Sequence, residues 1–148
     1  MTVYFAYGAN MDPVHMAACC PGAERLGQAT LADHAFDIAA GGFGTVRRVP
    51  GRVVVGVLWR LGPADLAALD TFEGVAEDFY RRCGARVTAP DGRLVDAMIY
   101  RPSNDAPGTP ASGYLERIVA VAQLLGFQPR YIAELQTLLQ PPATTNSG

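Results

Sequence analysis

Two stretches of the chain combine residue types that could carry out acid–base chemistry on a small molecule. The first is an aromatic segment that ends at a loop from Gly8 to Asn10, followed by Asp12 and Pro13. Glycine permits a sharp bend, asparagine tolerates unusual backbone angles, and Asp-Pro is typical of a helix start. Free amides beside a helix N-terminus can receive a carboxylate or a developing oxyanion. On these residues alone, a tight turn without a ligand is the alternative interpretation.

The second stretch places one carboxylate among apolar residues. Glu73 lies between Phe72 and Gly74, with Val75 close behind. We expect this side chain to lie in an apolar wall, where desolvation raises the pKa of a glutamate from about 4.3 toward neutrality. Such a pKa suits a general acid or base. By composition alone, an ordinary loop glutamate is the alternative.

Strands and helices must position these residues. Residues 3–7 are apolar on both faces, which predicts a core strand. The clearest strand covers residues 52–59, which are β-branched and apolar on both sides, and we expect it to pair near the first strand. Residues 13–20 form a predicted helix, and a second begins at Gly62-Pro63 and ends near Asp70.

The rest of the chain reads as short elements separated by turns. We expect one domain over residues 1–140 and a flexible tail at 141–148. The predicted segments within that domain are short strands at 23–38, a glycine-rich ligand-approaching segment or hairpin loop at 41–46, strands at 79–87 and 94–100, a loop at 102–113, and helices from Tyr114 to Gly126 and after Pro129.

Composition narrows the classes of partner. The chain has 148 residues, 49% of them hydrophobic, and a formal net charge of −2. This balance offers no basic surface for nucleic acid or anionic membranes, so we expect small-molecule partners or a second copy of the chain. Three cysteines, an odd number, and the absence of a signal segment or membrane span favour a cytoplasmic protein. No metal or cofactor is expected.

The order and spacing of several segments resemble the gamma-glutamylcyclotransferase-like (AIG2-like) family along the whole chain. The resemblance implies an α+β fold, namely a small mixed β-barrel or strongly curved sheet with peripheral helices, often as a homodimer. The segments that carry it are Tyr4 to Met11, Gly41-Gly42, Gly56 to Trp59, Leu69 to Val75, and Pro110 to Tyr114.

The same resemblance implies a reaction and a site. Enzymes of this family release 5-oxoproline and a free amine or amino acid from a gamma-glutamyl amide by intramolecular aminolysis, without a cofactor. The family's catalytic acid–base falls on Glu73. Ala9 stands where the family usually has serine, which removes one hydrogen bond of about 0.5–1.5 kcal/mol and changes preference more than competence. The residues expected to contact the substrate are Tyr4, Phe5, Ala6, Tyr7, Gly8, Ala9, Asn10, Tyr80 and Tyr114.

Alternative functions use the same residues. One is a cyclotransferase that removes a gamma-glutamyl group from an amine in secondary metabolism, and another is a non-catalytic small-molecule-binding member of the fold. Glu73 argues against the latter, because an unpaired carboxylate in an apolar cleft is costly. A cysteine nucleophile made of His15 and Cys19 is disfavoured because buried structural cysteines are far commoner. Arg81 and Arg82 could bind a substrate carboxylate, although a solvated face or a cross-strand ion pair is the expected role.

Overall fold

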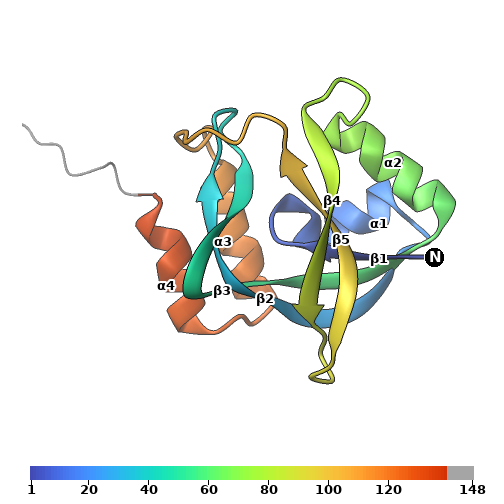
Figure 1. The fold of residues 1–148 in the computed structure, drawn as a ribbon, viewed down its shortest axis with the longest axis horizontal. Helices are drawn as coiled ribbons and strands as arrows, with labels where there is room; N and C mark the ends of the chain where they lie inside the picture. Colours follow the sequence, from blue (N-terminus) through green and yellow to red (C-terminus); the bar gives the residue numbers. More distant parts are fainter. Residues whose placement is uncertain (140–148) are drawn as a thin grey trace, which may run out of the picture.

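The computed structural model describes residues 1–139, which form a barrel flanked by helices (Figure 1). The predicted tail at 141–148 lies outside the described residues. This arrangement confirms the expected α+β class. In chain order the elements are β1 (Thr2–Ala6), η1 (Ala9–Met11), α1 (Pro13–Cys19), β2 (Glu24–Ile38), β3 (Gly44–Leu61), α2 (Pro63–Glu73), β4 (Tyr80–Thr88), β5 (Leu94–Pro102), α3 (Tyr114–Leu124) and α4 (Pro129–Thr137).

Strand β1 is one of the five strands of a closed mixed barrel with the order β1-β3-β2-β4-β5. It runs antiparallel to β3, with Tyr4 opposite Trp59, and meets β5 in parallel, with Tyr4 opposite Met98. The other neighbouring strands pair antiparallel. The prediction of a core strand paired with the strand at 52–59 is confirmed, because β1 has neighbours on both edges and buries its apolar side chains.

The predicted short strands at 23–38 are one continuous strand, β2. Its pairing with β3 shifts register between Arg25 and Gly27 and again between Ala32 and His34. Each irregularity reverses the alternation of inward and outward side chains. The sequence pattern of one bulged strand therefore resembles that of several short strands. Strand β3 likewise begins at Gly44, earlier than the predicted start at residue 52.

Gly56 on β3 allows the first strand to pack closely. A Cβ atom at this position would lie 2.3 Å from the Ala6 carbonyl oxygen and 2.8 Å from the Phe5 ring. A larger residue would therefore push β1 away from β3. The absence of a side chain at Gly56 lets the Phe5 ring fill the barrel interior.

Helix α2 extends beyond the predicted end near Asp70 and finishes at Glu73. Gly74 follows in the left-handed conformation, with φ of 69°. Its N–H donates to the Thr71 carbonyl (3.2 Å), and the N–H of Val75 donates to the Asp70 carbonyl (3.0 Å). This glycine-capped end satisfies the last carbonyls of the helix. Glu73 is consequently held at a helix terminus rather than in a loop.

The other helices follow the predicted pattern. Asp12 caps α1 by accepting a hydrogen bond from the Val14 N–H (2.9 Å), and Pro13 occupies the first turn, as predicted. Figure 1 shows α3 and α4 together on one side of the barrel and α1 and α2 together on the other. Within residues 1–139, no helix is long and apolar enough to cross a membrane.

Candidate active site

A cavity of about 680 Å³ opens where β1 ends, between the start of α3, the end of α2 and the loop that joins β2 to β3. Phe5 and Ala6 are fully buried in the barrel (0% exposed) and do not line this cavity. The Phe5 ring and the Ala6 carbonyl oxygen pack against Gly56 of β3, so the structure places these two residues apart from the other expected substrate contacts. The predicted residues that do line the cavity are Tyr4, Tyr7, Gly8, Ala9, Asn10, Glu73, Tyr80 and Tyr114.

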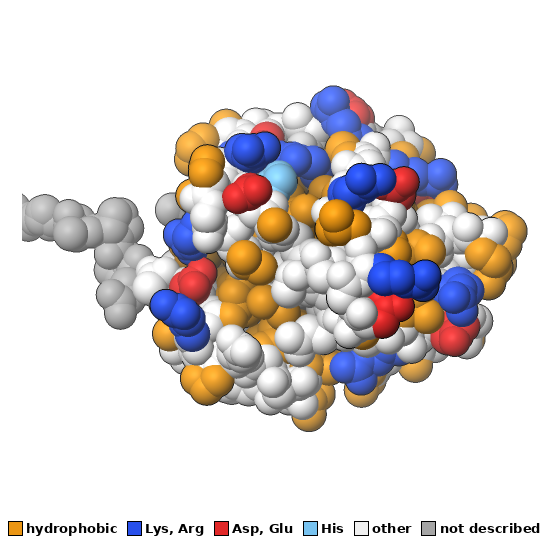
Figure 2. All heavy atoms as spheres, turned by 60° about the horizontal axis from the view of Figure 1, so that its bottom comes forward, with side chains coloured by type: hydrophobic (Ala, Val, Ile, Leu, Met, Phe, Trp, Pro, Cys, Tyr) orange, Lys and Arg blue, Asp and Glu red, His pale blue; other side chains and the backbone are white. Residues whose placement is uncertain are grey.

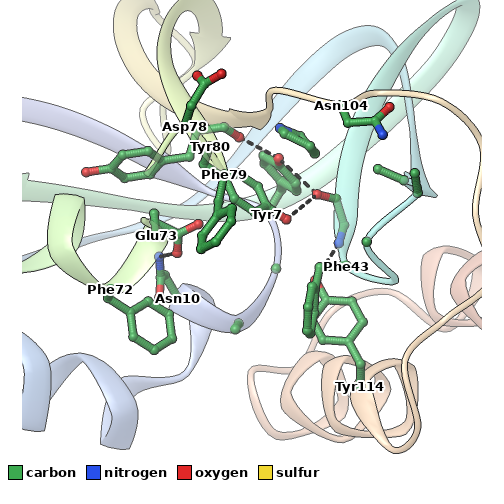
Figure 3. Close-up of a pocket in the computed structure, with 18 of the residues that line it drawn as sticks. Tyr7, Asn10, Phe43, Phe72, Glu73, Asp78, Phe79, Tyr80, Asn104 and Tyr114 are labelled. Carbon is green, nitrogen blue, oxygen red and sulfur yellow. Dashed lines mark hydrogen bonds between the residues drawn. The ribbon is translucent and has the colours of Figure 1, made fainter. Parts of the chain in front are cut away.

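Asn10 links Glu73 to the first strand (Figure 3). Its Nδ2 group donates one hydrogen bond to Glu73 Oε2 (3.1 Å) and another to Tyr4 Oη (2.8 Å). The asparagine side chain is buried, with 4% of its surface exposed. Turn η1 and the last residue of α2 thus bring an amide donor and a carboxylate together from positions far apart in the chain.

The surroundings of Glu73 suit proton exchange near neutral pH. Burial raises the pKa of its carboxyl to about 7, and the hydrogen bond from Asn10 opposes part of that rise. The predicted shift toward neutrality is confirmed. Both protonation states are therefore populated at neutral pH, as a group that accepts and returns a proton requires.

His15 contacts the far side of the Asn10 amide. Its Nε2 lies 2.9 Å from Asn10 Oδ1, and its ring packs against that of Phe72, tilted by 51° with centroids 4.6 Å apart. Because the Asn10 nitrogen donates to Tyr4 and Glu73, its oxygen must accept, and His15 donates through Nε2. Burial, followed by the charge of Arg117, lowers the pKa of His15, which favours the neutral ring.

The cysteine-nucleophile alternative finds no support in this geometry. His15 faces Asn10, while the Cys19 sulfur lies 3.5 Å from the sulfur of Cys20. The histidine instead fixes the direction of an amide, a role that the helical spacing of His15 and Cys19 did not suggest.

Tyrosine hydroxyls surround the peptide group of Gly44, where the β2–β3 hairpin enters the cavity wall. The Tyr80 hydroxyl donates to the Gly44 carbonyl (3.2 Å), and the Gly44 N–H donates to Tyr114 Oη (3.0 Å). A Cβ atom at Gly44 would lie 2.8 Å from Tyr114 Oη, and one at Gly8 would lie 2.9 Å from it. Both glycines therefore leave space for the tyrosine hydroxyl. The sequence indicated the glycine-rich segment but not this contact.

The loop after β1 keeps backbone amides available. Within η1, the first amide to donate is that of Met11, to the Gly8 carbonyl (3.0 Å), followed by Asp12 to Ala9 (3.2 Å). The amides of Gly8, Ala9 and Asn10 precede these bonds and do not donate within the turn. Because these three residues line the cavity, the loop can present N–H groups to a ligand. Ala9 contributes only a methyl group there.

Sequence reasoning missed part of the cavity lining. Tyr100 and Asn104 line the cavity from segments that carried no chemical signal in the sequence, and Phe43 lines it from the glycine-rich segment at 41–46 without having been named as a contact. Arg82 lies outside the lining and pairs with Asp70, with Nε 3.0 Å from Oδ1, so its ion pair joins β4 to helix α2 rather than to a neighbouring strand as expected.

Comparison with known proteins establishes the family. Residues 4–117 match the family described as "Gamma-glutamyl cyclotransferase, AIG2-like". The chain belongs to this family. It is 27% identical over 146 residues to the gamma-glutamylcyclotransferases of Bos taurus and Homo sapiens, in matches that cover 92% of the chain and 78% of each relative. A solved structure of a gamma-glutamyl cyclotransferase superposes with a TM-score of 0.84 at 25% identity, covering 99% of this chain and 92% of that one.

Family membership confirms three of the predictions made from the sequence. The resemblance to gamma-glutamylcyclotransferases is correct, the mixed barrel is the fold of the family, and the protein is an enzyme of the cyclotransferase kind.

Proposed function

We propose that the protein converts a gamma-glutamyl amide into 5-oxoproline and a free amine or amino acid by intramolecular aminolysis. One observation carries this proposal: a carboxylate with a pKa of about 7, Glu73, faces the same cavity as the amide-bearing loop from Gly8 to Asn10. The matched relatives named gamma-glutamylcyclotransferase support the choice of substrate.

In the proposed reaction, Glu73 first takes a proton from the substrate's α-ammonium group. The freed amine attacks the γ-carbonyl carbon of the same substrate molecule, and the new C–N bond closes the five-membered ring. Glu73 then returns the proton to the nitrogen of the original amide, whose C–N bond breaks, and the second proton lost by the ring nitrogen passes to the departing amine, which leaves as an ammonium ion. The two roles require a group that changes protonation state near the operating pH, which the environment of Glu73 supports.

The loop and the cavity shape supply the remaining contributions. Amides of Gly8, Ala9 and Asn10 can stabilise the oxyanion that forms on the γ-carbonyl oxygen. Ring closure within one molecule depends mainly on orientation, so holding the substrate folded contributes much of the rate enhancement. Because these donors are backbone groups, the alanine at position 9 is compatible with the reaction.

The test is product formation from a panel of gamma-glutamyl dipeptides and gamma-glutamyl amines. We expect wild-type protein to release 5-oxoproline and the free amine in equal amounts, measured by mass spectrometry, and Glu73→Gln to release neither. Thermal unfolding of both proteins establishes that the variant is folded. Absence of product from folded wild-type protein across the panel would overturn the proposed activity, and equal turnover by the variant would overturn the role of Glu73.

A further inference from the structure

Three phenylalanine rings from separate segments line the outer part of the cavity. Phe43 lies in the β2–β3 loop, Phe72 in α2, and Phe79 in the segment between α2 and β4. Their exposed fractions are 46%, 53% and 67%, which is unusual for such large apolar side chains. In Figure 3, Phe72 and Phe79 lie on the Glu73 side and Phe43 lies beside Tyr114 on the opposite side. Exposed apolar surface gathered at one cavity points to an apolar ligand.

Each ring is held by a neighbour although it is exposed. The Phe43 ring meets Tyr114 edge to face, with centroids 5.2 Å apart, and the Phe72 ring packs at a tilt against His15. Phe79 packs over Gly74, where a Cβ atom would lie 2.5 Å from its ring. The rings are therefore preorganised surfaces, which reduces the entropy lost when a ligand binds.

The cavity has more volume than a gamma-glutamyl group bound to the polar groups at its inner end would fill. Its volume of about 680 Å³ falls within the range of pockets that enclose drug-sized molecules. Asn10 and Glu73, with the loop amides, occupy the inner end, where the gamma-glutamyl group would bind. The space between the phenylalanine rings is then left for the amine that departs.

The charges around the cavity disfavour a carboxylate on that amine. Within residues 1–139, the charged side chains that line it are Glu73, Asp78 and Arg117. Arg117 already has a partner, since its Nη2 lies 3.7 Å from Asp12 Oδ2. Since Glu73 lies at the inner end, a free carboxylate on the leaving amine would meet Asp78 and would have to share Arg117 with Asp12. More widely, Figure 2 shows charges of both signs interspersed over one face of the molecule, with no broad basic area.

We propose that Phe43, Phe72 and Phe79 form the leaving-amine subsite, and that the preferred substrates are gamma-glutamyl amides of an arylalkyl amine that carries no carboxylate. This inference rests on the proposed function, because it assigns the second half of the same cavity. The subsite distinguishes two alternatives for the proposed function, namely an enzyme that releases amines without a carboxylate and an enzyme that releases amino acids.

Three synthetic substrates test the subsite: gamma-glutamyl-phenethylamide, gamma-glutamyl-ethylamide and gamma-glutamyl-phenylalanine. The first and second differ by the aromatic ring, and the first and third differ by the carboxylate. We expect kcat/KM for the phenethylamide to exceed that for the ethylamide by about tenfold to a hundredfold, the range for burying one aromatic ring. We expect it to exceed that for gamma-glutamyl-phenylalanine by about tenfold as well.

Variants test whether the phenylalanine rings cause the preference for the phenethylamide. The double variant Phe43→Ala/Phe79→Ala should reduce the ratio of phenethylamide to ethylamide turnover to within about threefold of one. Leu94→Ala is the matched control, because Leu94 is an exposed apolar residue (64%) on β5 that does not line the cavity. It should leave both rates and their ratio unchanged, and thermal unfolding should show that both variants are folded.

Binding to Glu73→Gln separates failure of the subsite from failure of the proposed function. Calorimetric titration of this variant with the three compounds ranks them without turnover, and the phenethylamide should bind most tightly. Equal binding of all three, or preference for gamma-glutamyl-phenylalanine, would overturn the subsite whether or not 5-oxoproline is released. Release of 5-oxoproline by wild-type protein without that preference would support the proposed function and overturn the subsite.

Discussion

Two of the carboxylates on helix α2, Asp70 and Glu73, have pKa values that the tertiary structure shifts in opposite directions. Asp70 accepts hydrogen bonds from Arg82 Nε (3.0 Å) and Tyr100 Oη (2.7 Å), and the arginine is the main reason that its pKa falls. Glu73, one turn later, has a neutral amide as its partner and a pKa raised to about 7 by burial.

This contrast shows that residue type and helix position do not decide a carboxylate's role. A neighbouring cation stabilises the ionised form of Asp70 and makes it a structural group, whereas desolvation leaves Glu73 free to exchange a proton. Asp70 still supports the site indirectly. It holds the hydroxyl of Tyr100, whose ring packs edge to face against Tyr4 at 5.5 Å.

The largest expected effect comes from converting each carboxylate to its amide. Glu73→Gln should lower kcat/KM for 5-oxoproline release by roughly a hundredfold to ten-thousandfold, the usual contribution of a general acid–base group. Asp70→Asn should lower it by less than about tenfold, because only the support of Tyr100 is weakened. Steady-state kinetics on one gamma-glutamyl amide measure both. Similar losses in the two variants would show that the pKa contrast has no bearing on catalysis.

The pH dependence of stability should differ in sign between the two groups. The pKa of Glu73 rises from about 4.3 in the unfolded chain to about 7 in the folded protein, so the folded state binds the proton more tightly. Wild-type protein should therefore lose stability relative to Glu73→Gln as pH rises from about 4 to 8, by about 3 kcal/mol in total.

Asp70 should behave in the opposite way, because its folded pKa is lowered. Its stabilisation relative to Asp70→Asn is fully present above the unfolded pKa of about 3.9 and disappears as pH falls through the folded value. Denaturant unfolding at several pH values measures both differences. A pH-independent difference between wild-type protein and Glu73→Gln would contradict the raised pKa.

A smaller effect should follow from removing the amide partner of Glu73. Asn10→Leu deletes the hydrogen bond that opposes the burial effect, so the pKa of Glu73 should rise further. The acid limb of the kcat/KM profile should then move to higher pH, with a loss of about fivefold to tenfold at pH 7, equivalent to one hydrogen bond.

His15 offers a matched pair for this experiment. His15→Leu removes the donor that fixes the Asn10 amide and should move the acid limb in the same direction by a smaller amount. His15→Gln can still donate and should restore part of the shift. An unchanged pH profile in both His15 variants, with activity merely reduced, would indicate a packing role against Phe72 instead.

The smallest effect should come from Arg82→Gln. The loss of the cation raises the pKa of Asp70, but the pair is partly exposed, with 46% of the arginine side chain accessible. The free energy of unfolding should fall by about 0.2–1 kcal/mol, and by less at high salt. Activity should be unchanged, because Arg82 does not line the cavity. A large loss of activity would place Arg82 in substrate binding after all.

Local sequence pattern determined several features of this protein. The apolar run of β1 and the Asp12-Pro13 helix start each depend on residues adjacent in the chain. Where the local interpretation failed, the reason was also local. The bulges in β2 interrupted the alternation of inward and outward side chains, and α2 continues past Asp70 to its cap at Gly74.

Tertiary structure alone decided which groups meet. Asn10 and Glu73 are 63 positions apart, and the Gly44 N–H and the Tyr114 hydroxyl are 70 apart. The aromatic subsite likewise draws Phe43 and Phe79 from different segments. Turns and helix caps follow from interactions over a few residues, but these contacts depend on the register with which the barrel strands close. That register arises from packing the whole core, so no single stretch of sequence encodes it.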